Sequence, residues 1–178
     1  MNTDKLVLVL VDVQSKLAQL MHDKESLFSN LQKLISGIKA LSIPIIWLEQ
    51  NPSKMGPTIS ELSQLLTDEN PIPKMSFSGC GEPACMAALR NTNRTQIILA
   101  GIETHVCIWQ TTADLLAAGY EVEIVTDAVS SRAFHDKQIA LQRMESVGAR
   151  LTTTEMILFE LLKTAKHPAF KTILKIVK

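Results

Sequence analysis

Three side chains that could together perform nucleophilic chemistry each lie close to the end of a short apolar run. Asp12 follows LVLVLV, Lys74 lies in PIPKMSF, and Cys107 comes shortly after QIILA. A cysteine attacks as its thiolate, so it needs a nearby base or a stabilising cation. An aspartate and a lysine are suited to these two tasks. The set therefore suggests covalent catalysis by a thiol.

Each of the three residues also has an ordinary structural explanation. Asp12 could cap a helix, Lys74 could be a solvated surface lysine, and Cys107 could be an inert thiol packed in the core. Cys107 is expected in the first turn of a helix, where the helix dipole favours the thiolate over the thiol. What favours chemistry is that an acid, a cation and a thiol all fall at predicted strand ends.

These strand ends belong to an alternation of predicted strands and helices. Apolar runs predict strands at 6–11, 43–48, 96–100 and 121–125, and weaker strands at 71–77 and 149–154. Apolar residues at helical spacing predict helices at 27–42, 104–119, 135–148, after Thr153 or Thr154, and at 168–178. The pattern predicts a three-layer α/β fold with a doubly wound, Rossmann-like, six-stranded parallel sheet and helices on both faces. Ligands of such sheets bind beyond the carboxyl ends of the strands.

Length and composition limit the class of protein. The chain has 178 residues, of which 46% are hydrophobic, so we expect one domain over 1–178 with a C-terminal helical extension at about 167–178. The 18 basic and 18 acidic residues balance, which argues against nucleic acid and membrane partners. The N-terminal apolar run is too short to span a bilayer. Three cysteines without framework spacing fit the reducing cytoplasm.

No sequence motif indicates a cofactor or a metal. The chain lacks a GxGxxG after the first strand, a GxSxG nucleophile elbow and a Walker A loop. Cys80 and Cys85 could begin a zinc site, but the four scattered histidines supply no second pair of ligands. We therefore expect no cofactor and no metal, and a small molecule as the substrate.

Three segments resemble the motif regions of the isochorismatase-like cysteine hydrolases: LVLVDVQ, PKMSFSG and GIETHVCIWQTTADLLAAGYEVEIVTDAVSSR. EQNPSKMGPTISEL and the tail HPAFKTILKIVK are similar to the metal-free, isochorismatase-domain-containing subgroup. The resemblance implies a six-stranded parallel sheet and a catalytic triad of Asp12, Lys74 and Cys107. It also implies a cis peptide between Ile102 and Glu103, which would aim the N–H of Glu103, beside that of Cys107, at a developing oxyanion.

Departures from the family pattern reduce the number of reactions that this chain could catalyse. Nicotinamidases carry an aspartate and histidines that hold a metal after the second strand, where this chain has WLEQNPSKMG. Isochorismatases proper lack the nucleophilic cysteine. We therefore interpret the chain as a metal-independent cysteine hydrolase that cleaves a small amide through a thioester. The alternatives are a degenerate binding or scaffold protein, and an enol-ether hydrolase that does not need Cys107. Family members commonly form dimers or larger homo-oligomers, which we also expect here.

Overall fold

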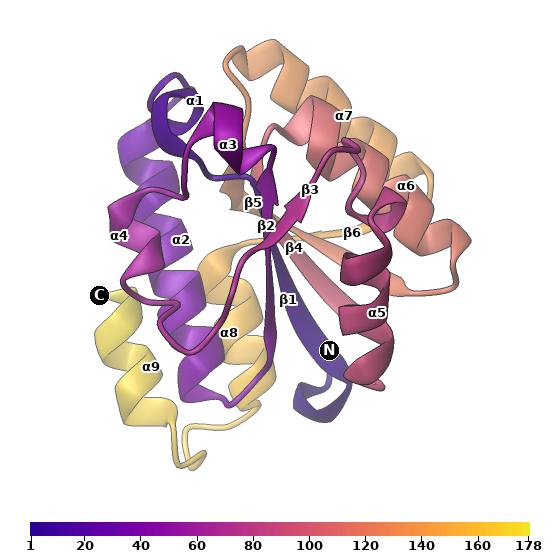
Figure 1. Ribbon diagram of the computed structural model, residues 1–178. Helices are drawn as coiled ribbons and strands as arrows, with labels where there is room; N and C mark the ends of the chain where they lie inside the picture. Colours follow the sequence, from indigo (N-terminus) through magenta and orange to yellow (C-terminus); the bar gives the residue numbers. More distant parts are fainter.

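The chain folds around one parallel sheet that has helices on both faces (Figure 1). The computed structural model describes residues 1–178. The strands lie in the order β3-β2-β1-β4-β5-β6 and all neighbours pair in parallel. Their bounds are β1 (Leu6–Val11), β2 (Ile45–Gln50), β3 (Ile72–Lys74), β4 (Gln96–Ile102), β5 (Glu121–Ser130) and β6 (Arg150–Thr152). The predicted fold class is confirmed.

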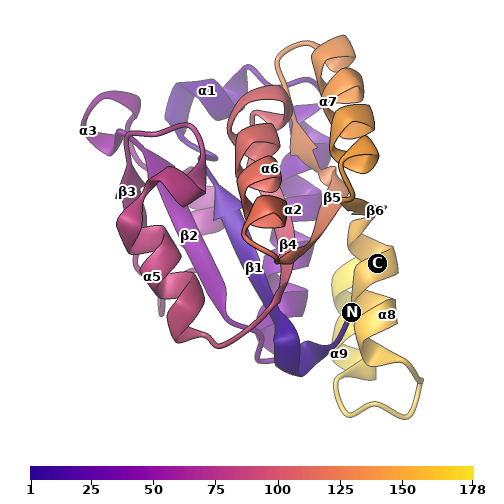
Figure 2. The same ribbon diagram turned by 90° about the vertical axis from the view of Figure 1, so that its right-hand side faces the viewer.

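The helices form the two outer layers (Figures 1 and 2). One face is covered by α1 (Ser15–Gln19), α2 (Lys24–Ala40), α4 (Ser60–Ser63), α8 (Thr154–Leu162) and α9 (Phe170–Val177). The other face is covered by α5 (Pro83–Asn91), α6 (Trp109–Ala117) and α7 (Phe134–Ser146). The connections contain the short helix α3 (Pro52–Met55), the 3-10 turns η1 (Thr3–Lys5) and η2 (Gly79–Gly81), and a π-helical turn, η3 (Thr104–Ile108).

The alternating leucines and valines of β1 explain how one strand contributes to the hydrophobic cores on both faces of the sheet. Side chains alternate between the faces of a strand, so LVLVLV presents three leucines to one side and three valines to the other. The leucines pack with residues of α2 and α8, and the valines pack with residues of α5, α6 and α7. All six side chains are at most 1% exposed. Such a continuous apolar run is what a parallel sheet covered on both faces requires.

Several elements differ from the sequence-based prediction. The strands β4 and β5 extend further than expected, to Ile102 and Ser130, and the helix expected at 104–119 begins as the π-helical turn η3. The helix α5 and the short helices α1, α3 and α4 were not predicted. The nine residues of α5 bury only Cys85 and Leu89, which gives too weak a periodicity to predict a helix.

The order of the sheet reverses between β1 and β4. The chain runs outward from β1 to β2 and β3, and then returns to β4 on the other side of β1. The crevice at the carboxyl ends of these two strands is where doubly wound sheets bind ligands. Asp12 directly follows β1, and the turn η3, which contains Cys107, follows β4. The topology therefore brings these two residues to the same crevice.

The C-terminal helix α9 packs against the other helices on its face of the sheet. Ile173 is fully buried, α9 contacts α2 and α8, and the rings of Phe159 and Phe170 meet edge to face with centroids 6.4 Å apart. Lys33 Nζ donates a hydrogen bond of 3.1 Å to the carbonyl oxygen of Val177. None of the helices has the length and apolar character that crossing a membrane would require.

Candidate active site

Asp12 and Lys74 form a buried ion pair at the carboxyl edge of the sheet. Lys74 Nζ lies 2.7 Å from Asp12 Oδ2, and the two side chains are 0% and 2% exposed. Lys74 is the last residue of β3, whereas Asp12 follows β1, so the lysine side chain reaches across the intervening strand β2. The sheet thus brings together two residues that are 62 positions apart, as the sequence analysis expected.

The ammonium group of Lys74 is surrounded by hydrogen-bond acceptors. Besides Asp12, it meets Gln50 Oε1 at 2.6 Å and the carbonyl oxygens of Ser76 and Phe77 at 3.2 and 3.1 Å. A buried charge is tolerated only when it is paired and hydrogen-bonded. These contacts hold Lys74 as a fixed cation beside the carboxylate, which excludes the alternative of a solvated surface lysine.

Cys107 lies in the π-helical turn η3, just before α6 begins, and is 7% exposed. The carbonyl oxygen of Glu103 accepts from the N–H groups of Val106 and Ile108 at 3.1 and 3.2 Å, which closes this turn. Both Asp12 and Lys74 are close enough to shift the pKa of the Cys107 thiol. The three residues that the sequence analysis singled out therefore meet at one place.

The helix dipole led us to expect a low pKa for the Cys107 thiol. This expectation was wrong. Burial, and to a lesser extent the Asp12 carboxylate, raise the pKa of Cys107 to about 12, although the Lys74 ammonium opposes both effects. Burial also raises the pKa of Asp12 above its ordinary value, despite the Lys74 cation. A protonated thiol beside a carboxylate of raised basicity fits proton transfer during attack rather than a thiolate formed in advance.

Replacing Asp12 with asparagine is expected to speed the alkylation of Cys107 by iodoacetamide near pH 8 by about tenfold or more. The substitution removes the negative charge that raises the pKa of the thiol, while the Lys74 cation that lowers it remains. The thiolate fraction at a given pH therefore increases. The rate at Cys107 is measured by peptide mass spectrometry between pH 7 and pH 10.

Cys85 provides an internal reference for this measurement. Burial raises its pKa to about 12 as well, but the charges that act on it are those of Cys80, Lys74 and Glu82, and not that of Asp12. Its alkylation rate should be the same in both proteins. An equal increase at Cys85 would mean that the substitution has loosened the fold, and an unchanged rate at Cys107 would contradict control by Asp12.

The segment between β4 and η3 has an unusual backbone. The Ile102–Glu103 peptide is cis, as the resemblance implied, and Gly101 before it has a φ of +120°. Glu103 is 7% exposed, and its Oε1 accepts from both the backbone N–H and Nε of Arg132 at 3.1 Å. The Glu103 side chain is thus held by the segment after β5, so that any role in binding an oxyanion falls to its backbone.

Two glutamines of the site were missed by the sequence analysis. Gln14 Oε1 accepts from the N–H of Gln50 at 2.7 Å, and Gln14 Nε2 donates to the carbonyl oxygens of Gln50 and Gly56 at 3.0 and 2.7 Å. Gln14 thereby fastens the end of β2 to the Asp12 segment, and Gln50 in turn contacts Lys74. The position of Gln50 could have indicated its place in the site, because Gln50 ends β2 at the carboxyl edge that also carries Asp12 and Lys74.

The side chains do not form a ready set of ligands for a metal ion. No three His, Cys, Asp or Glu side chains are grouped so that they could hold an ion. Cys80 and Cys85, which could have begun a zinc site, are both free thiols, and neither belongs to a group of three such side chains.

Fold and site together define a class of protein. Residues 6–156 match the family model described as "Isochorismatase domain", and the chain belongs to this isochorismatase-like hydrolase family. It is 40% identical over 177 residues to isochorismatase domain-containing protein 2 of Danio rerio, which covers 99% of this chain and 89% of that protein.

Solved structures agree with this assignment. The MAR1 ribonuclease from Caenorhabditis elegans is 38% identical with a TM-score of 0.94, over 99% of this chain and 91% of that one. The YcaC gene product from Escherichia coli, an octameric hydrolase of unknown specificity, is 24% identical with a TM-score of 0.94, over 99% and 89% of the two chains. The second likeness shows the fold alone.

Proposed function

We propose that this protein is a cysteine hydrolase that cleaves the amide C–N bond of a small molecule through a thioester intermediate. The observation that carries the proposal is the meeting of Cys107 with the buried Asp12–Lys74 ion pair at the topological switch point. A thiol, a base and a fixed cation in one crevice are the groups that covalent catalysis by cysteine needs.

In the first step, Sγ of Cys107 attacks the carbonyl carbon of the substrate while its proton moves to Asp12. The π electrons of the carbonyl group move onto its oxygen, and the backbone N–H groups of Glu103 and Cys107 bind the oxyanion. The raised pKa of Asp12 suits it to receive this proton. Lys74 stays paired with Asp12 and stabilises negative charge on the thiol sulfur as it develops.

In the second step, the C–N bond breaks and Asp12 passes the proton to the leaving nitrogen, which departs as an amine or ammonia. Water then attacks the thioester with Asp12 again as the base, so that the C–S bond breaks and the acid leaves. The proton returns to Cys107. One carboxyl group thus serves as the base and the acid in turn, with Lys74 keeping its position fixed.

The test is a substrate panel assayed with the native protein and with Cys107→Ala. The panel contains small primary amides, an enol ether and a single-stranded RNA, the last because a 38% identical structure is called a ribonuclease. We expect an amide to release ammonia and hydroxylamine to trap its acyl group as a hydroxamate. We also expect a thioester on the Cys107 peptide by mass spectrometry, and none of these signals with Cys107→Ala.

Other outcomes would replace the proposal. Turnover of the enol ether or the RNA that persists in Cys107→Ala would remove the thiol from the mechanism. Failure of every amide to react or to acylate Cys107, with binding retained, would favour a degenerate binding or scaffold protein. The enol-ether hydrolase and the binding or scaffold protein are the alternatives that the sequence left open, whereas the RNA is included only because of the similar structure.

We further propose that the protein works in the cytoplasm as a homo-oligomer. Its three cysteines are all free, which fits a reducing compartment. A structural neighbour is described as octameric. Light scattering that found only a 19.7 kDa species would contradict the oligomer.

A further inference from the structure

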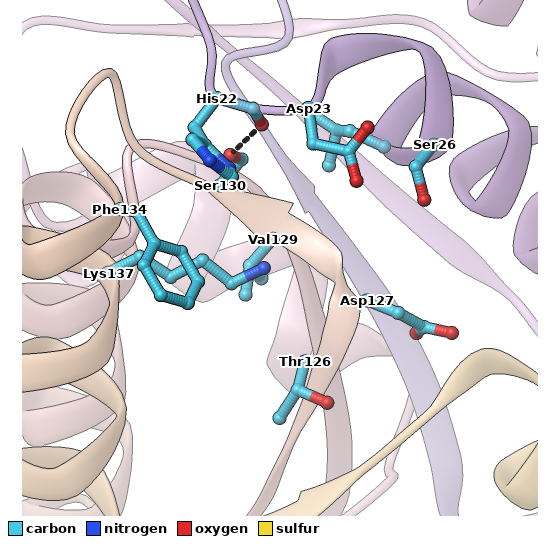
Figure 3. Close-up of a pocket in the computed structure, with 10 residues that line it drawn as sticks. His22, Asp23, Ser26, Thr126, Asp127, Val129, Ser130, Phe134 and Lys137 are labelled. Atoms are coloured by element: carbon cyan, nitrogen blue, oxygen red, sulfur yellow. Dashed lines mark hydrogen bonds between the residues drawn. The ribbon is translucent and has the colours of Figure 1, made fainter.

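A separate cavity of about 240 Å³ opens beside β5, between the start of α2 and the start of α7 (Figure 3). Its wall combines polar groups with apolar ones, and includes His22, Asp23, Ser26, Asp127, Phe134 and Lys137. None of Asp12, Lys74 and Cys107 lines it. Chemistry in this cavity therefore does not require the side chains of Asp12, Lys74 and Cys107.

Lys137 places its amino group in this cavity without a fixed partner. The half-buried side chain extends from α7 past the Phe134 ring, and its nitrogen ends beside Val129 (Figure 3). Lys39 and Lys74 form ion pairs within 3.5 Å, whereas Lys137 makes neither an ion pair nor a hydrogen bond. An amine that is shielded from water but unpaired is poorly stabilised as an ammonium ion.

The charges around Lys137 only partly compensate for its burial. Burial lowers the pKa of Lys137, and Asp127 from β5 and Asp23 from the turn before α2 oppose this effect. Asp127 is already engaged, because its Oδ1 accepts from the N–H and the hydroxyl of Thr154 at 2.8 and 2.9 Å. His22, whose ring is tilted by 33° to that of Phe134 with the centroids 5.0 Å apart, is the other titratable group on the wall. More of Lys137 is therefore free amine at neutral pH than of an ordinary surface lysine.

We propose that Lys137 is a nucleophilic amine that condenses with short aliphatic aldehydes inside this cavity. The nitrogen lone pair attacks the aldehyde carbon, and the carbonyl π electrons move to oxygen, which takes a proton from nitrogen to give a carbinolamine. The hydroxyl group then takes a proton from solvent and leaves as water, while the nitrogen lone pair forms the C=N bond of an iminium cation. The iminium cation would lie near the Asp23 and Asp127 carboxylates, and Leu27 and Val129 would contact the alkyl chain.

The test is reductive alkylation by propanal and cyanoborohydride at pH 7, with each lysine quantified by peptide mass spectrometry. We expect labelling of Lys137 about fivefold or more faster than labelling of the exposed Lys171. The preference should shrink as the pH rises and ordinary lysines lose their protons. Lys137→Arg should remove this fast site, and the matched control Lys171→Arg should leave it intact.

Size selectivity separates a cavity site from a merely reactive surface amine. A pyrene carboxaldehyde carries four rigid fused rings and is far bulkier than propanal, so it should enter the cavity poorly and label Lys137 no faster than Lys171. Equal rates at Lys137 and Lys171 with propanal, or an undiminished preference with the bulky aldehyde, would overturn the proposal. Because Cys107 takes no part in this labelling, the result does not depend on whether the protein hydrolyses amides.

Discussion

Replacement of Lys74 by methionine should lower the free energy of unfolding by about 3–5 kcal/mol. The substitution keeps most of the side-chain volume but removes the cation 2.7 Å from Asp12 and leaves that carboxylate buried without a counter-ion. Because burial already raises the pKa of Asp12, loss of Lys74 should raise this pKa further. Protonation of Asp12 then removes the buried charge, so the loss of unfolding free energy should be smaller at pH 5 than at pH 8.

Urea denaturation at both pH values measures this effect, and two further variants locate its cause. Lys39→Met removes a lysine that pairs with Asp68 and Glu69 at the surface, and should cost about 1 kcal/mol or less. The double substitution of Lys74→Met with Asp12→Asn removes both charges and should recover part of the loss. If Lys74→Met were no more harmful than Lys39→Met, the ion pair would not contribute as we describe.

Gly101→Ala is expected to lower the free energy of unfolding by more than about 4 kcal/mol, beyond the range of most substitutions. Gly101 has a φ of +120°, which side-chain-bearing residues rarely adopt. A Cβ atom there would lie 2.1 Å from the carbonyl oxygen of Val11, on the neighbouring strand β1. That oxygen belongs to the backbone of a central strand and cannot move aside, so either β4 or β1 must shift.

Gly119→Ala is the matched control for this prediction. Gly119 also has a positive φ, of +87°, but a Cβ atom there would meet nothing within 4 Å. Its substitution adds only backbone strain, which costs about 1–2 kcal/mol. Denaturation curves for the two variants thus separate the clash from the strain. Similar losses for both would show that β1 and β4 can separate at this point without cost.

Local pattern was enough to predict the layers of the fold. The alternating leucines and valines of β1 and the helical spacing in α2, α7 and α8 follow from which side chains must leave water, and this depends on neighbours in the sequence. The strand ends then placed Asp12, Lys74 and Cys107 at one edge, because parallel strands share a carboxyl edge. The helix α5 was not predicted, because it buries only two of its nine residues and so has a weak apolar periodicity.

The sequence by itself therefore determined the three-layer parallel fold and the residues that meet in the crevice. Only the tertiary structure decided the protonation of Cys107, the pairing of Gln14 with Gln50 and the shielded amine of Lys137. These properties arise from desolvation and from contacts among segments that come from different strands and helices. Desolvation depends on every atom packed around a group, so a dipole argument confined to one helix gave the wrong direction for the Cys107 thiol.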